Sequence, residues 1–476
     1  MALSATIEAM TMKMQIAMAL FATGLLVGCA RKPYPPEKCT YFLTGEVDLP
    51  GKKGLTDTDG DGVSNGWDQC PNNPEDWLDS DRDGIGNRFD NDIDGDNIAN
   101  EEDEDMDGDG ALNVDEEADG SDPRDPTSIP DLPRLEFDAG ILSEEARWYR
   151  GDFHVHTEYS HDSQEPLTSW FDATFNARLD FTAITDHRNV DVFFDESWSQ
   201  ASDVLLIPGI EWGGPGHANM FGLRTDNTTN YDSAADVFAA WRKNYLQGGA
   251  QSLNHYGNDD DATYWERILD EEPKLLQFLD VMEVWNVAWP AGASQNLVSI
   301  ARWEQLLLDG HMIGALGGSD VHYSFLPIGY PTTFVYAQSL SVPGILHGLR
   351  EGRTYVANAF PYTPGPNGAN FNHPNTPTLE FTITSDDNRQ PEAIIGDFIS
   401  AGPVTIRISV TDAQGPIQLY RGLDVIASFT DHRVGDTVFY TFDDDATAPS
   451  WYRVEMWTGG GIDADLVLFS SPIYIR

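Results

Sequence analysis

Short apolar runs alternate with helical patterns along the middle of the chain. Residues 181–184, 204–207 and 281–284 are apolar at nearly every position, as strands buried on both faces of a parallel sheet are. Between them, residues 233–246 repeat large apolar side chains at helical spacing and stop before Gly248, a residue that commonly ends a helix. This alternation predicts an α/β fold of the (β/α) barrel type, whose sites lie at the carboxyl ends of the strands.

Apolar and polar residues alternate with period two towards the C-terminus. The alternation covers residues 379–383, 404–410, 417–420 and 451–457, and period two is the spacing of a strand with one buried face. We therefore expect a small β-sandwich over residues 378–476, preceded by a proline-rich linker at 361–377.

Residues 12–29 read MKMQIAMALFATGLLVGC, a lysine followed by an apolar run and small residues before a cysteine. The apolar run is too short to cross a bilayer, so residues 1–28 are expected to be a secretory signal peptide. The residues Leu26-Val27-Gly28-Cys29 resemble a bacterial lipobox, which implies lipid attachment at Cys29 and a place in the bacterial cell envelope, facing the periplasm or the cell surface. A plain secretion signal is the alternative. Exported thiols usually oxidise, so we expect a disulfide between Cys39, in a tether at 29–56, and Cys70.

The chain is strongly acidic. Its 28 Lys and Arg stand against 78 Asp and Glu, a formal net charge of −50. Phosphate backbones would repel such a chain, so we expect no nucleic-acid partner. The acid is also concentrated, because residues 57–126 hold 26 of the Asp and Glu and only 3 Arg.

Within that segment the pattern D-x-D-x-D occurs four times. Each run is followed by Gly or Asn at the sixth loop position, Asn at the ninth and an acid at the twelfth, which suits the oxygen ligands of calcium. The loops follow one another without room for helices and, with the motif D-Q-C-P at 68–71, resemble thrombospondin type 3 repeats. The resemblance implies a calcium-stiffened array over 57–122 and a linker at 123–146, and a disordered acidic linker is the alternative. The expected calcium ligands are Asp57, Asp59, Asp61, Asp68, Asp79, Asp81, Asp83, Asp90, Asp92, Asp94, Asp96, Asp103, Asp105, Asp107, Asp109 and Glu116.

Eight of the eleven histidines fall between residues 154 and 322, and most follow the expected strands. His154 and His156 are two apart on a strand and so share a face. Imidazoles and carboxylates without a thiol favour zinc, manganese or iron. The other groups at strand ends are Asp186, His187, Glu211, His217, His255, Asp320 and His322.

The ordered motifs G-D-F-H-V-H-T-x-x-S, I-T-D-H, G-x-E and G-S-D-x-H, over residues 149–355, resemble the PHP (polymerase and histidinol phosphatase) metallohydrolases. The resemblance implies a distorted seven-stranded (β/α) barrel over 147–360 with two or three divalent metals. A hydroxide bridging the metals would attack the substrate, because coordination lowers the pKa of water to about 7. The resemblance assigns a first metal to His154, His156, Glu211 and Asp320, a second, bridged by Glu211, to His217 and His255, and a third to Asp162, His187 and His322.

Some roles stay open. Many family members carry an aspartate where His161 stands, so His161 is the alternative to Asp162. Glu283 resembles a strand-end acid of the family that contacts a ligand, and Asp186 is a candidate for orienting a ligand histidine. Arg188 is one of the few cations near the motifs that could clamp a phosphate.

Three aromatic residues, Trp212, Trp285 and Tyr323, stand close to expected ligands or strand-end acids. If they line an apolar pocket, they favour an ester, amide or carbamate over a charged phosphate. The segments 346–358, 451–454 and 471–474 resemble the CehA/McbA branch of PHP proteins, named for carbamate-insecticide hydrolases, which extends the resemblance to residues 149–476.

The sequence thus predicts an exported, lipid-anchored, metal-dependent hydrolase of a small-molecule phosphoester or carboxylester, carbamate or amide. Its membrane contact would be the lipid on Cys29. The alternative is a catalytically idle, calcium-dependent surface binding or adhesion protein that keeps the barrel as a scaffold.

Overall fold

The structure is a computed structural model, and all of its described residues belong to one compact unit, Cys39–Arg476. The expected signal peptide, Cys29, Cys39 and the first calcium loop lie outside the described residues. The structure describes residues 70, 73, 76, 78–80, 85–95, 98–103, 105–108, 112–119, 121–125, 141–201, 203–213, 216–223, 233–246, 248–286, 293–358, 376–385, 392–458 and 465–475.

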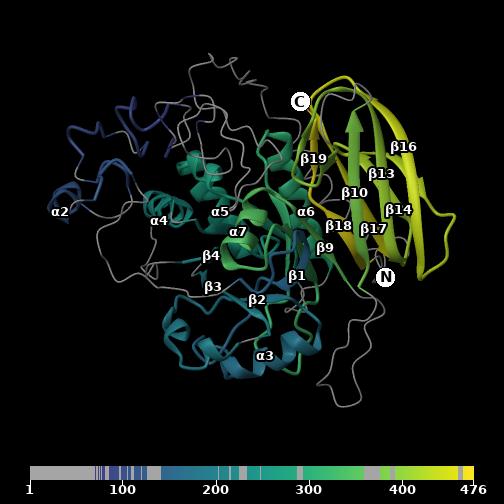
Figure 1. Cartoon of the computed structure of the whole chain (residues 1–476), viewed down its shortest axis with the longest axis horizontal. Coiled ribbons are helices and arrows are strands. Elements are labelled where there is room, and N and C mark those ends of the chain that lie inside the picture. The colour runs from purple at the N-terminus through teal and green to yellow at the C-terminus, as the bar shows by residue number, and fades with distance from the viewer. Residues whose placement is uncertain are drawn as a thin grey trace, which may run out of the picture. The chain divides into compact units, whose positions relative to one another are not determined.

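Six mutually parallel strands make up most of the sheet of the α/β domain (Figure 1). A seventh strand, β4 (Ala218–Phe221), lies between β3 and β5 and is antiparallel to both. Only residues 213–217 connect β3 to β4, too few for a helical crossover, so the chain has to turn back on itself. The parallel strands are β1 (Arg147–Asp152), β2 (Phe181–Ile184), β3 (Leu205–Trp212), β5 (Ala250–Leu253), β6 (Val281–Asn286) and β7 (Gly314–Gly318).

Two more strands extend this sheet beyond β1. β8 (Thr332–Ala337) is antiparallel to β1, and β9 (Thr354–Ala357) is antiparallel to β8. A Cβ on Gly317 of β7 would lie 2.7 Å from side-chain atoms of Pro331 and Val356, so β7 approaches the β8–β9 side closely and the sheet curls. The expected α/β fold is confirmed, but a regular strand–helix alternation does not describe the sheet, because β4 and β8 are antiparallel.

Helices occupy most of the links between these strands. The predicted helix at 233–246 is confirmed as α4, which buries Phe238, Trp241 and Tyr245 and is followed by Gly248 in the left-handed region with φ of 86°. None of the described helices is long and apolar enough to cross a membrane. The elements are α3 (Leu167–Asn176), η1 (Asp191–Phe194), η2 (Trp198–Gln200), α4 (Ala234–Leu246), α5 (Asp259–Glu271), η3 (Pro273–Gln277), α6 (Ala293–Leu308) and α7 (Val342–Arg350).

The C-terminal strands form two facing sheets around one hydrophobic cluster. One sheet has four strands, in the order β11-β10-β13-β16. The other is continuous with the barrel sheet, because β18 pairs with β9. Ser471 enters the barrel itself, where its Oγ accepts a hydrogen bond from the backbone N of Ala315 at 2.7 Å. The strands are β10 (Thr378–Ser385), β11 (Ala393–Ile394), β12 (Phe398–Ile399), β13 (Gly402–Ala413), β14 (Ile417–Arg421), β15 (Asp424–Phe429), β16 (Asp436–Ala446), β17 (Ser450–Thr458), β18 (Asp465–Ser470) and β19 (Ile473–Ile475).

The acidic segment repeats one hydrogen-bond pattern. In three consecutive loops the ninth-position Asn (Asn87, Asn100 or Asn113) accepts a hydrogen bond from the backbone N of the second loop residue, at 2.8–3.0 Å. Asn100 and Asn113 also donate to the carbonyl that lies ten residues earlier. The loops are therefore regular units held by their asparagines.

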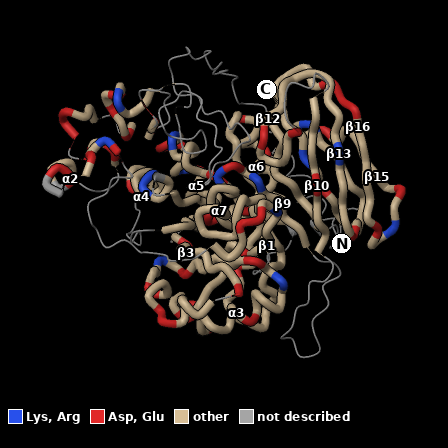
Figure 2. Tube along the Cα trace, viewed as in Figure 1, with Lys and Arg blue, Asp and Glu red and all other residues tan. Residues whose placement is uncertain are grey.

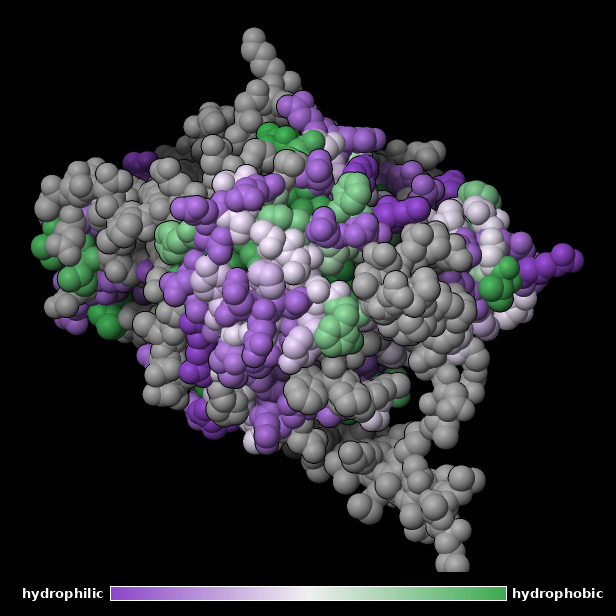
Figure 3. All heavy atoms as spheres, turned by 90° about the horizontal axis from the view of Figure 1, so that it is seen from below, coloured by the Kyte–Doolittle hydropathy of each residue, from purple (hydrophilic) through white to green (hydrophobic). Residues whose placement is uncertain are grey.

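Helix α2 (Asn113–Asp119) lies in this segment, where acidic residues far outnumber basic ones (Figure 2). Arg242 of α4 donates to Asp94 and to the carbonyl of Asp107, which connects the acidic segment to the barrel. Cys70 is buried and disulfide-bonded. On the face of the molecule in Figure 3, the described residues are mostly hydrophilic, and the hydrophobic ones are scattered.

Candidate metal centre

The ends of the barrel strands bring together nine side chains, which are the nine metal ligands expected from the sequence. Glu211 lies near the end of β3, whereas the other ligands that follow strands come within four residues of a strand end. They are His154, His156, His187, His255 and Asp320. Each group below has ligand atoms within 4.8 Å of one another. The groups are His154, His156, Glu211 and Asp320; Glu211, His217 and His255; and His156, Asp162, His187 and His322.

The first group is completely withdrawn from water, since its four members are at most 3% exposed. The Nε2 atom of His154 lies 3.1 Å from Glu211 Oε1 and 3.5 Å from Asp320 Oδ1. The Nε2 atom of His156 lies 3.2 Å from an oxygen of each of these carboxylates. Two imidazoles and two carboxylates therefore face a common point.

The first group fits a divalent metal. The Nε2 atoms of His154 and His156 are buried and have no hydrogen-bond partner within the described residues, although carboxylate oxygens lie close by. Buried polar atoms normally have a partner, so two ring nitrogens without one, aimed at the same carboxylates, are arranged as ligands of a cation. Nitrogen and oxygen ligands without sulfur suit zinc, manganese or iron.

Other carboxylates hold the outer ring nitrogens of these histidines. Glu283 Oε1 lies 2.7 Å from His154 Nδ1, and its other oxygen accepts the backbone N of His255 at 2.9 Å. Asp261, on α5, places one oxygen 3.3 Å from His217 Nδ1 and the other 2.9 Å from His255 Nδ1. With Nδ1 held in this way, each ring turns Nε2 towards the centre, as ligating histidines usually do.

The third group is more exposed than the first. Asp162 Oδ2 lies 3.2 Å from His187 Nε2 and 3.1 Å from His322 Nε2, and His322 Nδ1 donates to the carbonyl of Asp320 at 2.9 Å. The structure adds His156 to this group. His161, the alternative to Asp162, is 76% exposed and only reaches Asp162 at 4.0 Å, so it lies at the rim of the pocket.

The charges in this centre shift the pKa values strongly. Burial lowers the pKa of His156, but its contacts with Asp320 and Glu211 outweigh this and raise it to about 9. Burial raises the pKa of Glu211, but the neighbouring histidines, His154 above all, hold it well below its usual value. Without metal the centre therefore keeps protons on its histidines to balance its carboxylates, and a metal would replace those protons.

The backbone is strained at this site. Arg188, His255 and Asp320 have φ of 47°, 25° and 53°, in the left-handed region that non-glycine residues rarely adopt. All three line the pocket. Such strain concentrates at functional sites, where the surrounding structure enforces it.

Two candidate roles of neighbouring residues are not observed among the described residues. Asp186 does not contact a ligand histidine; its carboxylate accepts the backbone N and the hydroxyl of Thr157, both at 2.6 Å. The aromatic residues Trp212, Trp285 and Tyr323 do not line the pocket. Two of them are buried core residues, and Tyr323 is 44% exposed and stacks on Phe325.

The neighbouring side chains point away for reasons of strand geometry. Adjacent residues on a strand face opposite sides, so Trp212 points away from the site that Glu211 enters. Trp285 is two residues after Glu283 and would share its face in a regular strand, but the pairing of β6 with β7 shifts register between them. Asp261 was not expected from the sequence, where it is the last of three consecutive aspartates with nothing to distinguish it.

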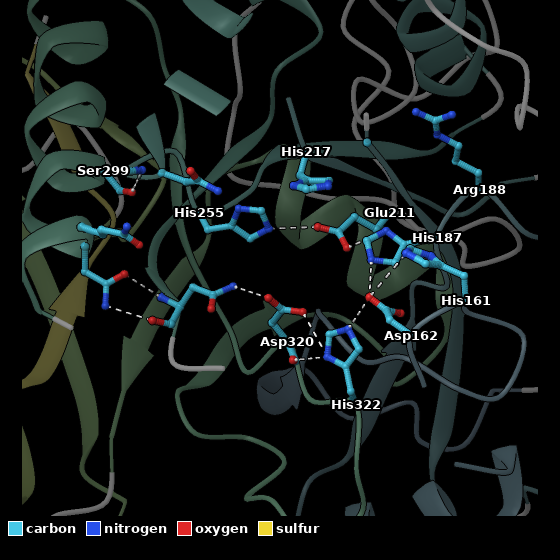
Figure 4. A pocket seen from close by; sticks show the side chains of 16 residues that line it. His161, Asp162, His187, Arg188, Glu211, His217, His255, Ser299, Asp320 and His322 are labelled. Carbon is cyan, nitrogen blue, oxygen red and sulfur yellow. Dashed lines mark hydrogen bonds and ion pairs between the residues drawn. The ribbon is translucent and has the colours of Figure 1, made fainter. Parts of the chain in front are cut away.

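The metal groups form one wall of a cavity of about 760 Å³. Figure 4 shows His217, Glu211, His187, Asp162 and His322 turned towards one another across this cavity, with Arg188 and Ser299 on opposite sides. A cavity of this size accommodates a small organic molecule.

Comparisons with known proteins add the following. No model of a protein family matches the chain, and no curated protein matches it. A solved two-domain protein from Bacteroides vulgatus, containing a predicted PHP-like metal-dependent phosphoesterase, is 18% identical over 71% of this chain and 99% of its own, with a TM-score of 0.39.

Two other solved structures are similar to 37% of this chain. A putative metal-dependent phosphoesterase from Bifidobacterium adolescentis is 16% identical over 89% of its length, with a TM-score of 0.25. An amidohydrolase from Chromobacterium violaceum is 17% identical over 89% of its length, with a TM-score of 0.27. At these scores the likenesses add nothing to the assignment of the site, which rests on its own geometry.

Proposed function

We propose that the protein is a metal-dependent hydrolase that cleaves a phosphoester of a small molecule. The observation that carries the proposal is the position of Glu211. Its Oε1 lies 3.1 Å from both His154 and His255. Its Oε2 lies 3.2 Å from His156 and 3.3 Å from His187. One carboxylate thus touches all three ligand groups, which supports a single centre for neighbouring cations.

Divalent cations held by these groups would lower the pKa of water and stabilise the charge that develops on the oxygens of the substrate. The chain itself supplies orientation and binding. Glu283 fixes the ring direction of His154 and Asp261 that of His255, and Asp261 also lies 3.3 Å from His217 Nδ1. Arg188 and His161 line one side of the cavity and would bind an anionic oxygen of the substrate.

A phosphoester is favoured over a carbonyl substrate because the cavity is lined by polar side chains. The aromatic wall that would have favoured an ester, amide or carbamate is not formed by Trp212, Trp285 or Tyr323. The affinity of Arg for phosphate oxygens adds to this preference.

The test is a panel of p-nitrophenyl phosphate, bis(p-nitrophenyl) phosphate and p-nitrophenyl acetate with zinc or manganese, together with metal analysis. We expect hydrolysis of a phosphate ester that is lost in His154→Ala and Glu211→Gln. If only p-nitrophenyl acetate is hydrolysed, the substrate is a carbonyl compound and the phosphoester proposal is wrong. Absence of both bound metal and hydrolysis would instead support the idle surface-binding protein.

We also propose that the acidic segment binds calcium. The support is the burial of Asp79, Asp107 and Glu116, each 0% exposed, because acidic groups held out of water need a compensating cation. Calorimetric titration of calcium into EGTA-treated protein tests this, and absence of heat would refute it.

Export and lipid anchoring at Cys29 are a separate proposal, supported by the sequence of residues 12–29. The same applies to the CehA/McbA resemblance, which rests on its three sequence segments. Replacing Cys29 with Ser should release the protein from the membrane fraction of a bacterial host, and retention in that fraction would refute the anchor.

A further inference from the structure

The pocket has two chemically different ends. Arg188 and His161 lie at one end, and Figure 4 shows Ser299 at the opposite side. The residues around Ser299 that line the cavity carry carboxamides or no side chain. We call this set the carboxamide wall, and it consists of Asn258, Asn286, Gln295, Asn296, Ser299 and Gly257.

The wall is held in place by its own hydrogen bonds. Asn296 accepts the backbone N of Asn286 and donates to its carbonyl, both at 3.0 Å. Ser299 Oγ accepts the backbone N of Gly257 at 3.0 Å. A Cβ on Gly257 would lie 1.9 Å from the carbonyl of Gln295, so glycine is required there for α6 to approach. Hydrogen bonds and close packing therefore hold the carboxamide wall in a fixed arrangement.

The wall is also connected to the metal centre. The side-chain nitrogen of Asn286 donates to Glu283 Oε2 at 3.1 Å and lies 3.5 Å from Asp320 Oδ2. Asp320 is a ligand of the first group, and Glu283 orients His154. A group bound on the wall would thus lie next to a bond that is being broken at the centre.

Two groups of the wall are available to a ligand. The side-chain amide of Gln295 and the side-chain nitrogen Nδ2 of Asn258 have no hydrogen-bond partner in the part of the chain that the structure describes, whereas Asn258 Oδ1 accepts the backbone N of Asp260. A carboxamide offers donors and an acceptor but no charge. A hydroxyl group, which also donates and accepts, satisfies it, whereas a hydrocarbon would leave these polar groups unpaired.

We propose that the carboxamide wall binds the leaving group of the substrate, and that this leaving group is a neutral, hydroxyl-bearing alcohol of the polyol type. The inference rests on the proposed hydrolysis of a phosphoester. In that reaction the bond between phosphorus and the alcohol oxygen breaks. Water supplies hydroxide to phosphorus and a proton to the departing oxygen, so phosphate and the polyol are released.

The test compares glycerol 1-phosphate with n-propyl phosphate, which has the same carbon chain but lacks both free hydroxyls. Each competes with p-nitrophenyl phosphate in initial-rate measurements on the full chain loaded with manganese, which give an apparent dissociation constant even if the compound is itself hydrolysed. If no phosphate ester is hydrolysed, calorimetric titration gives the constant. We expect glycerol 1-phosphate to bind about tenfold or more tightly, the effect of one to two hydrogen bonds. Gln295→Leu should bring the two dissociation constants together, and thermal unfolding checks that this variant is folded.

Ser294→Ala is the matched control, because Ser294 is exposed and precedes Gln295 on α6. It should keep the preference. Equal dissociation constants in the unmodified protein, or a ratio that Gln295→Leu leaves unchanged, would overturn the inference. A preference in binding without hydrolysis of any phosphate ester would overturn the proposed function and leave the wall as a polyol site. Hydrolysis of a phosphate ester without a preference for glycerol 1-phosphate would keep the proposed function and overturn the polyol site. If neither compound binds, both the proposed function and the polyol site are overturned.

Discussion

Removing Asp261 should empty one metal site and leave its neighbour filled. Asp261 is 1% exposed, and its carboxylate lies against both His217 and His255, at 3.3 and 2.9 Å. Loss of one such contact typically costs about 10–100-fold in metal affinity, or roughly 1.4–2.8 kcal/mol. Asp261→Asn keeps one acceptor oxygen, so we expect a weakening of about tenfold, whereas Asp261→Ala loses both contacts and should reach about 100-fold or more.

The first metal should stay, because His154 is oriented by Glu283 and not by Asp261. Chelator competition gives the affinity of each site, and anomalous diffraction shows which position is empty. Asp260→Asn is the control, since Asp260 is exposed on the same helix. Asp261 also accepts the backbone N of Gly216 and His217, both at 3.1 Å, so unfolding by urea has to be measured in parallel. Unchanged second-site affinity in Asp261→Ala, or equal loss from both sites, would refute the reasoning.

Three further results are expected. Metal affinity should rise with pH up to about 9, because below the raised pKa of His156 the metal has to displace a proton; affinity that is constant between pH 6 and 9 would contradict this. Burial, together with the charges of Arg353 and Arg350, lowers the pKa of His347 to about 3. Below about pH 6.5 the unfolded chain therefore binds a proton at this histidine that the folded chain does not bind. Stability should therefore fall between pH 6.5 and 3, by up to about 1.4 kcal/mol per pH unit, and thermal unfolding of His347→Gln should show a smaller fall than the unmodified protein. Arg453 is 2% exposed and binds Glu304 and Glu455, so Arg453→Met should cost about 3–5 kcal/mol in urea unfolding, and neutralising both glutamates in the same variant should restore part of it.

Most side chains of the candidate metal centre could be named from the sequence, because several of them follow expected strands and the resemblance to PHP metallohydrolases implied the full set. His154 and Asp320, far apart in the chain, come together because strand ends in this type of fold share one mouth. What could not be predicted depends on geometry within and beyond the strands. Asp261 reaches the site from a helix, and the register shift after Glu283 is invisible in the sequence.

The sheet was predicted only in outline. The runs that became β2 and β6 are apolar at most positions, Thr182 and Glu283 being the exceptions, and could be recognised as buried strands. The antiparallel β4 follows from the short connection at 213–217, which becomes informative only once β3 is known to extend to Trp212. The Asn positions of the acidic loops were recognised as a repeat. That each Asn accepts a hydrogen bond from the second residue of its own loop depends on backbone geometry and could not be predicted.

The continuous sheet means that the C-terminal strands cannot be treated as a detachable module. β18 completes the edge of β9, and Ser471 completes the hydrogen bonding of Ala315 and Thr354 inside the barrel. A chain shortened at residue 378 would expose an unpaired strand edge and leave buried backbone groups unsatisfied beside the strand that leads to Asp320. The α/β domain and the C-terminal strands should therefore fold and unfold as a single cooperative unit.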